Sequence, residues 1–142
     1  TDNMHADMIE VMRWALNLGR IQTGGIDDGW QPADMLRMAT YNGAHAMGLG
    51  DHMGSLEAGK LADMVCVDMR RPHLVPCINP LGNLVHTGQG RDVALVLVHG
   101  EVVVEGGRAL RVDQDSILAD AQQAAAALWQ RARAQVEPRR TV

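Results

Sequence analysis

The side chain best placed to do chemistry is the carboxylate of Asp2, in the opening tripeptide Thr1-Asp2-Asn3. A carboxylate beside a divalent cation stays ionised, orients a bound water and accepts its proton as the water attacks. His5 follows three residues later, ahead of a predicted helix. Taken alone, Asp2 is explained more simply as a helix cap or a terminal residue, and His5 as a histidine of a surface loop.

The histidines of the chain do not form a recognisable metal site. There is no His-x-His pair, and no two histidines have the i, i+4 spacing, with an acidic neighbour, of a helix-borne zinc site. Zinc needs about three protein ligands plus water, so the chain is not expected to hold a catalytic metal tightly by itself. The glycine-containing stretches 48–54 and 88–92 match neither phosphate-loop pattern. The histidines are His5, His45, His52, His73, His86 and His99.

Composition limits the class of protein. The 142 residues suffice for one domain with a core, whereas a complete barrel of eight strands and eight helices takes roughly 250 residues. Apolar residues make up 46% and charged residues 21%, as in ordinary globular proteins. The net charge of −4 argues against a nucleic-acid partner. No apolar run approaches the ~20 residues of a membrane span, so no membrane partner is expected.

The two cysteines indicate a reducing environment. Cys66 and Cys77 form no CxxC motif, and no signal peptide is visible at the start of the chain. We therefore expect reduced thiols in a cytoplasmic protein. Cys66 lies in an apolar run and is expected to be buried.

The first part of the sequence predicts helices. Apolar residues recur with helical spacing over residues 7–21, where Asn3 or Asp7 is a possible cap. Pro32 suits the first turn of a second helix, which residues 33–39 continue. Thr40 is expected to cap a third, short helix over residues 42–47.

A small sheet is predicted next. Residues 61–69 are expected to form a strand that is covered on both faces, because its middle is apolar on both sides. The prolines of residues 70–80 predict an extended loop. Residues 93–98 and 101–105 predict a hairpin whose turn is His99-Gly100. The remaining expected elements are a helix over 81–86, a strand over 109–112 and a helix over 115–135. The fold class is therefore α+β.

Three glycine-punctuated blocks occur in order along the chain: ATYNGAHAMGLG at 39–50, GSLEAGKLADMVCVD at 54–68 and ALVLVHGEVVVEGG at 94–107. Together they resemble the C-terminal part of the metal-dependent amidohydrolase superfamily. The resemblance implies the last helices of a (β/α)8 barrel, part of a small flanking β-sandwich and a C-terminal helix. The implied division is 1–50 for the end of the barrel with the metal-aspartate loop, 51–112 for the flanking β-domain and 113–142 for the helix and tail.

The resemblance also gives the first two candidate residues a role. In this superfamily an aspartate at the end of the eighth barrel strand binds the metal and shuttles a proton, and the setting of Asp2 resembles it. Asp2 is thus the implied catalytic and metal-binding residue, and His5 would lie near the substrate at the barrel mouth. The divalent metal, zinc or iron, would belong to the complete enzyme, because the remaining ligands are absent from this chain.

The implied reaction is hydrolysis of a C–N bond other than a peptide bond. The chain looks most similar to the branch of deaminases and aminohydrolases of nitrogen heterocycles, in which metal-activated water attacks a ring carbon and ammonia or an amine leaves. A chlorohydrolase variant stays open. The chain would be a severed piece of such an enzyme and inactive alone. The alternative is a non-catalytic α+β module with a structural or interaction role.

Truncation has a physical consequence. The helix over 7–21 and the apolar run near residue 65 would normally be buried against parts that this chain lacks. Exposed apolar patches of more than a few hundred Å² usually become interfaces. We therefore expect a homo-oligomer that acts, in its complete form, on a small heterocyclic substrate.

Overall fold

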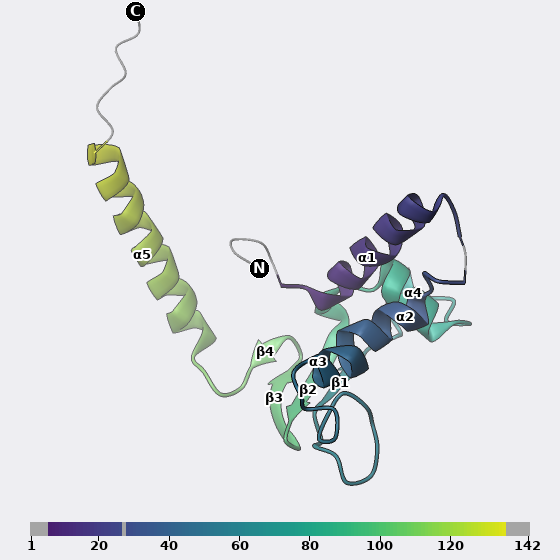
Figure 1. Cartoon of the computed structure of the whole chain (residues 1–142). Coiled ribbons are helices and arrows are strands. Elements are labelled where there is room, and N and C mark those ends of the chain that lie inside the picture. Colours follow the sequence, from purple (N-terminus) through teal and green to yellow (C-terminus); the bar gives the residue numbers. More distant parts are fainter. Residues whose placement is uncertain (1–5, 27, 136–142) are drawn as a thin grey trace, which may run out of the picture. The chain divides into compact units, whose positions relative to one another are not determined.

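The computed structural model describes residues 6–26 and 28–135 (Figure 1). The chain divides into two compact units, Thr1–Gly107 and Arg108–Val142. Helices and strands both occur in it, so the predicted α+β class is confirmed.

Helix α1 spans Met8–Thr23, close to the predicted 7–21. Asp7 caps its start, and Gly24 ends it in the left-handed conformation at φ 79°. The interior Gly19 leaves room for the indole of Trp30, which a Cβ at this position would overlap. Local capping signals thus set both ends of this helix.

Helix α2 spans Pro32–Arg37, as the proline predicted. The chain then continues without a break through a π-helical segment, η1 (Met38–Asn42), into α3 (Gly43–Ala46). The expected cap at Thr40 is wrong, because the Thr40 hydroxyl donates to the Leu36 carbonyl at 2.7 Å within the continuing helical turns. The π-helical segment η1 thus joins α2 to α3 where the sequence predicted a break between two helices.

The first unit contains an antiparallel sheet in the order β1-β2-β3. Strands β2 (Val93–Val98) and β3 (Glu101–Glu105) form the predicted hairpin. Its turn has positive φ at both central residues, 53° at His99 and 78° at Gly100, which is the pattern of a type I′ turn.

Strand β1 (Met64–Val67) pairs with β2 and is shorter than the predicted 61–69. The expectation that both of its faces are covered is wrong: Val65 is 60% exposed and Cys66 is exposed too. The apolar residues of β1 are therefore of a kind that is usually buried, but the described residues do not cover them.

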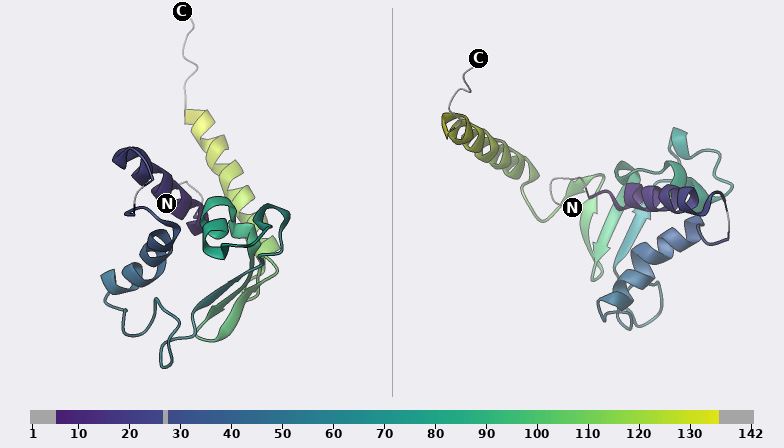
Figure 2. Two further views of the ribbon diagram at one scale, coloured as in Figure 1. Left: turned by 90° about the vertical axis from the view of Figure 1, so that its right-hand side faces the viewer. Right: turned by 45° about the horizontal axis from the view of Figure 1, so that its top comes forward.

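The loop predicted over 70–80 contains a short 3-10 helix, η2 (Pro72–Leu74). Helix α4 (Pro80–Thr87), capped by Asn79, contains the predicted 81–86 and extends it by one residue at each end, and the 3-10 turn η3 (Gly90–Asp92) leads into β2. Helices α1, α2 and α4 pack together (Figure 2). Their contact buries Leu16, Met35 and Val85, which are at most 1% exposed.

The second unit contains the two-residue strand β4 (Arg108–Ala109) and helix α5 (Gln114–Gln135). The helix agrees with the predicted 115–135, whereas the strand is shorter than 109–112 and is displaced by one residue. Within this unit Arg108 forms an ion pair with Asp115 at 3.0 Å. Over the described residues, no helix combines the length and the apolar character that crossing a membrane requires.

Candidate functional site

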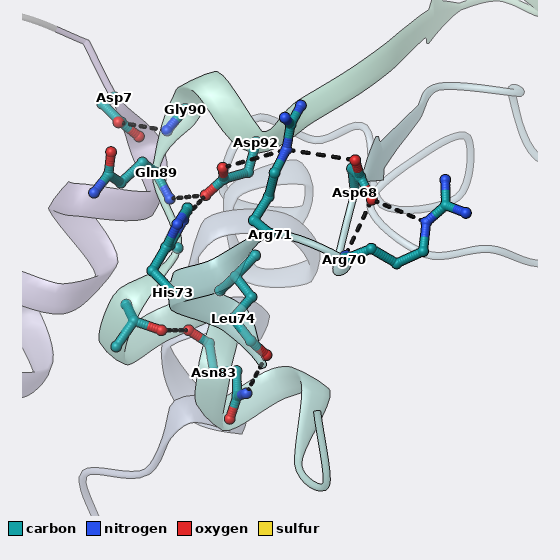
Figure 3. A network of polar contacts seen from close by, with 12 residues as sticks. Asp7, Asp68, Arg70, Arg71, His73, Leu74, Asn83, Gln89, Gly90 and Asp92 are labelled. Carbon is teal, nitrogen blue, oxygen red and sulfur yellow. Dashed lines mark hydrogen bonds and ion pairs between the residues drawn. The ribbon is translucent and has the colours of Figure 1, made fainter. Parts of the chain in front are cut away.

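The two residues singled out for chemistry, Asp2 and His5, lie outside the described residues. The nearest described acidic side chain is Asp7, the cap of α1. Its carboxylate begins a network of polar contacts that reaches the end of the η3 turn and the segment before α4 (Figure 3). Asp7 therefore lies at one end of this network.

Both oxygens of the Asp7 carboxylate are used. Oδ1 accepts hydrogen bonds from the backbone amides of Ile9 at 2.9 Å and Glu10 at 3.3 Å, which caps α1. Oδ2 accepts from the amide of Gly90 at 2.8 Å, across 83 positions of sequence. A Cβ at Gly90 would lie 3.0 Å from this oxygen, so the close approach favours glycine.

Asp92 closes the turn that begins at Gly90. The amide of Gln89 donates to Asp92 Oδ2 at 2.9 Å, and the amide of Asp92 donates back to the Gln89 carbonyl at 2.9 Å. Nε2 of His73 lies 2.7 Å from the same carboxylate, and Nε of Arg71 lies 4.0 Å from its other oxygen. The Asp92 side chain is buried, so these partners replace its hydration.

The interaction partners of Asp92 change its pKa by more than burial does, and in the opposite direction. Burial alone raises the pKa of the Asp92 carboxyl. The hydrogen bonds from His73 and Gln89, with the charges of His73 and Arg71, lower it by more, so the pKa falls below its ordinary value. The carboxylate is therefore held ionised in the fold.

Asp68 lies beside the same cluster. Its carboxylate accepts from the Arg70 amide at 3.1 Å and forms ion pairs with the side chains of Arg70 and Arg71. The hydrogen bond from the Arg70 amide and the nearby guanidinium charges lower the pKa of Asp68 against a smaller opposing effect of desolvation. Arg71 thus bridges two carboxylates and joins the end of β1 to the η3 turn.

The far end of α4 is also tied to α1. Arg13 donates through Nε to the Val85 carbonyl at 3.1 Å and through Nη2 to the Gly88 carbonyl. Desolvation and the charges of Arg20 and Arg13 lower the pKa of His86. The α1 surface therefore meets two separate parts of the 80–92 segment, one through Asp7 and one through Arg13.

Two cavities adjoin these elements. One, of about 230 Å³, is lined by Arg71, Pro72, His73, Arg91 and Asp92. The other, of about 290 Å³, is mostly apolar and is lined by Met8, Val11, Met12, Ala15, Met35, Met38, Ala39 and Gly43. The His73 imidazole, hydrogen-bonded to Asp92, lines the first cavity, and no Ser, Thr or Cys stands among the lining residues to act as a nucleophile.

The described residues do not supply a metal centre. Within the ranges 6–26 and 28–135, no three His, Cys, Asp or Glu side chains are grouped so that they could hold an ion. A zinc site needs about three protein ligands. The described part of the chain alone therefore does not fit a catalytic metal.

The cluster around Asp92 was not predicted from the sequence. The spacing of Gln89 and Asp92, i and i+3, is a capping-box signal that is visible in the sequence. The pairing of Asp92 with His73, 19 residues earlier, depends on how η2 packs beside η3 and has no local signal. The contact between Asp7 and Gly90, 83 positions apart, has no local sequence signal either.

The chain resembles known hydrolases along most of its length. The model of the amidohydrolase family matches residues 1–103. A 5-methylthioadenosine/S-adenosylhomocysteine deaminase from Pelotomaculum thermopropionicum is 42% identical over 130 residues, which cover 91% of this chain and 29% of that protein.

Similar solved structures support the same family. An adenosine deaminase from Xanthomonas campestris with bound zinc gives a TM-score of 0.78 at 31% identity, over 82% of this chain and 26% of that one. Atrazine chlorohydrolase from Arthrobacter aurescens, complexed with zinc, gives 0.74 at 30% identity, over 81% and 25%. The chain spans less than a third of the length of each of these proteins. By the family match and these likenesses, the chain belongs to the amidohydrolase family, in the branch that includes deaminases and chlorohydrolases, as the three sequence blocks indicated.

Proposed function

We propose that the complete protein is a metal-dependent hydrolase of C–N bonds other than peptide bonds, and that it deaminates a nitrogen heterocycle of the adenosine type. The observation that carries the proposal is the family match over residues 1–103. The names of the relatives supply the substrate class, since they include deaminases of adenosine and of its 5-methylthio derivative. The small heterocycle is thus the proposed partner of the complete enzyme.

Residues 1–50 would form the end of the barrel, 51–112 part of the flanking β-domain and 113–142 the C-terminal helix and tail. Within the first segment we assign Asp2 as a metal ligand and catalytic residue, and His5 as a substrate contact. Support comes from their place immediately before α1, whose start is fixed by Asp7.

The metal, zinc or iron, would draw on ligands beyond the described residues, because these contain no sufficient group. Zinc is bound in the two solved relatives. We therefore expect the isolated 142-residue chain to be inactive. The free, exposed Cys66 and Cys77 fit a reducing compartment, and we propose a cytoplasmic location.

The test uses the longest open reading frame that contains these 142 residues. The purified product should contain zinc or iron and release ammonia from adenosine or 5′-methylthioadenosine. Asp2→Asn should abolish this release, whereas the matched change at the exposed Asp51, Asp51→Asn, should leave it unchanged.

A product without stoichiometric metal and without activity on either nucleoside would overturn the proposal and favour the non-catalytic module. Activity of the 142 residues alone would contradict the expected need for further ligands. Release of chloride from a chlorotriazine, with no release of ammonia, would move the assignment to a chlorohydrolase.

A further inference from the structure

We propose that helix α5 is an interaction surface for a second copy of this chain, and that two α5 helices pair antiparallel. The helix runs without interruption over 22 residues, Gln114–Gln135 (Figure 1). Within its own unit it is tied to β4 at its first turn, where the Ala109 amide donates to Gln114 Oε1 and Arg108 donates to Asp115. The inference is independent of the proposed function, because it concerns assembly rather than chemistry.

The helix exposes large apolar side chains near both of its ends. Ile117 and Leu118 follow its first turn, and Leu128 and Trp129 come before its last turn. All four are 52–66% exposed. Single apolar residues on a surface are ordinary, but two groups of them at the two ends of one helix can be buried together by a second helix.

The spacing of the apolar residues fits a pair of helices. Leu118, Ala121, Ala125 and Leu128 follow one another at intervals of three, four and three residues, which is the a/d spacing of a coiled coil. We call these four residues the α5 seam. In an antiparallel pair that is symmetric about residue 123, Leu118 lies level with Leu128 of the second copy, and Ala121 lies level with Ala125. The small inner residues let the helices approach closely, while the leucines bury apolar surface on either side.

The distribution of charge along the helix favours the antiparallel direction. The start of the helix is acidic and its end is basic; the residues are Asp113, Asp115 and Asp120, then Arg131 and Arg133. In the symmetric antiparallel pair, Asp115 comes level with Arg131 of the second copy. Asp113 comes level with Arg133 in the same way. A parallel pair would instead place like charges, and the like ends of the two helix dipoles, side by side.

The charged groups are accessible to a second copy. The ion pair between Asp115 and Arg108 leaves the Asp115 side chain 76% exposed. Asp120, Arg131 and Arg133 are exposed too, and none of them forms an ion pair with another described residue. Exposed ion pairs contribute little to affinity, so the α5 seam supplies the stability of the pair and the charges select its direction.

The first test mixes two charge variants of the 142-residue chain. Arg131→Glu with Arg133→Glu makes α5 acidic at both ends, and Asp115→Lys with Asp120→Lys makes it basic at both ends. Each variant alone should associate through α5 about tenfold more weakly than the parent, because like charges meet. An equimolar mixture should regain the association as a mixed complex, which sedimentation velocity detects when one variant carries a fluorescent label.

The matched control changes the same number of charges away from α5. Arg70→Glu with Arg91→Glu alters two exposed arginines of the first unit and gives the same net charge as the acidic α5 variant. Mixed with the basic α5 variant, this control should form no mixed complex. A mixed complex of equal strength with the control would overturn the proposal, because attraction between net charges would then explain it.

The second test measures the direction of the pair. Nitroxide labels are attached at Ser116→Cys or at Gln123→Cys, in a chain that carries Cys66→Ser and Cys77→Ser. The two labelled positions are seven residues apart and share one face of the helix. In the antiparallel pair the labels at 123 lie level, whereas those at 116 are offset along the axis by about 21 Å, since a helix rises about 1.5 Å per residue.

Double electron–electron resonance measures both label distances in the parent background. We expect a clearly longer distance for the label at 116 than for the label at 123. Equal distances would show a parallel pair and overturn the proposed direction. Charge variants that associate as strongly as the parent, with no preference for the mixed complex, would overturn the pairing itself and would indicate that another part of the complete protein covers α5.

Discussion

Asp92 shows how a buried charge is kept in this fold. Its side chain is 2% exposed and has His73, Gln89 and Arg71 as partners. An isosteric substitution by Asn removes the charge of Asp92 and keeps its shape. The partners then stay in place but face a weaker hydrogen-bond acceptor. The strength of such contacts can therefore be measured by an isosteric change.

We predict that Asp92→Asn lowers the free energy of unfolding by about 1–3 kcal/mol at neutral pH, because a charge-assisted hydrogen bond to His73 is lost. The folded-state pKa of Asp92 lies below its ordinary value of 3.8, so the carboxylate contributes fully above that value. The contribution disappears as the pH falls through the lower folded-state pKa.

Urea unfolding of parent and variant at neutral pH and near pH 3 checks this prediction. The difference between the two proteins should be large at neutral pH and shrink in acid, whereas Asp51→Asn should match the parent throughout. Equal stability of Asp92→Asn and parent at neutral pH would contradict it.

At the residue scale, the sequence predicted what depends on near neighbours. Asp7, one of the two caps that the sequence offered beside Asn3, is the cap of α1. Its second contact, to Gly90, could not be predicted, because it depends on how two distant segments pack. The burial expected for Cys66 was wrong for the same reason: an apolar neighbourhood in sequence does not show what covers a strand.

At the scale of elements, the β2–β3 hairpin was predicted with its bounds, because its turn residues carry a strong local signal. The amide of Gly100 donates to the Ala62 carbonyl at 3.0 Å, and the amide of His99 donates to the Asp63 carboxylate at 2.6 Å. The turn is thus joined to the residues before β1. The π-helical segment η1 has no such signal, and the predicted cap at Thr40 is wrong.

We predict that Gly100→Ala destabilises the first unit by about 1–2 kcal/mol, because Gly100 has a φ of 78° that residues with a Cβ adopt at a cost. The control is Gly25→Ala, since nothing lies within 4 Å of a Cβ there and no positive φ is required. The free energies of unfolding of the two variants, measured in urea, provide the comparison. A Gly100→Ala protein as stable as Gly25→Ala would show that the turn tolerates the methyl group.

At the scale of the whole molecule, the family was predicted correctly, whereas the predicted active-site residues stay predictions. The first two glycine-punctuated blocks and most of the third lie in the region, residues 1–103, that the family model matches. Asp2 and His5 stay predictions, since they lie outside the described residues. In a barrel enzyme the catalytic residues come from the ends of several strands. Any one stretch of the sequence therefore contains only some of the metal ligands.

The exposed face of α1 leads to a prediction about assembly. Val11, Trp14 and Leu18 are 50%, 58% and 54% exposed, on a helix whose other face packs against α2 and α4. Val11 also lines the apolar cavity, so the exposed surface continues into a hollow. Apolar patches of this kind tend to associate in water.

We therefore predict that the isolated 142-residue chain self-associates in a concentration-dependent way, and that Leu18→Lys weakens the association by placing a charge on this face. Leu56→Lys is the matched control, because Leu56 is 79% exposed but lies in the loop between α3 and β1. Sedimentation velocity over about a hundredfold range of concentration measures the effect. A parent chain that stays monomeric over that range would contradict the prediction, and equal weakening by both variants would assign it to net charge rather than to α1.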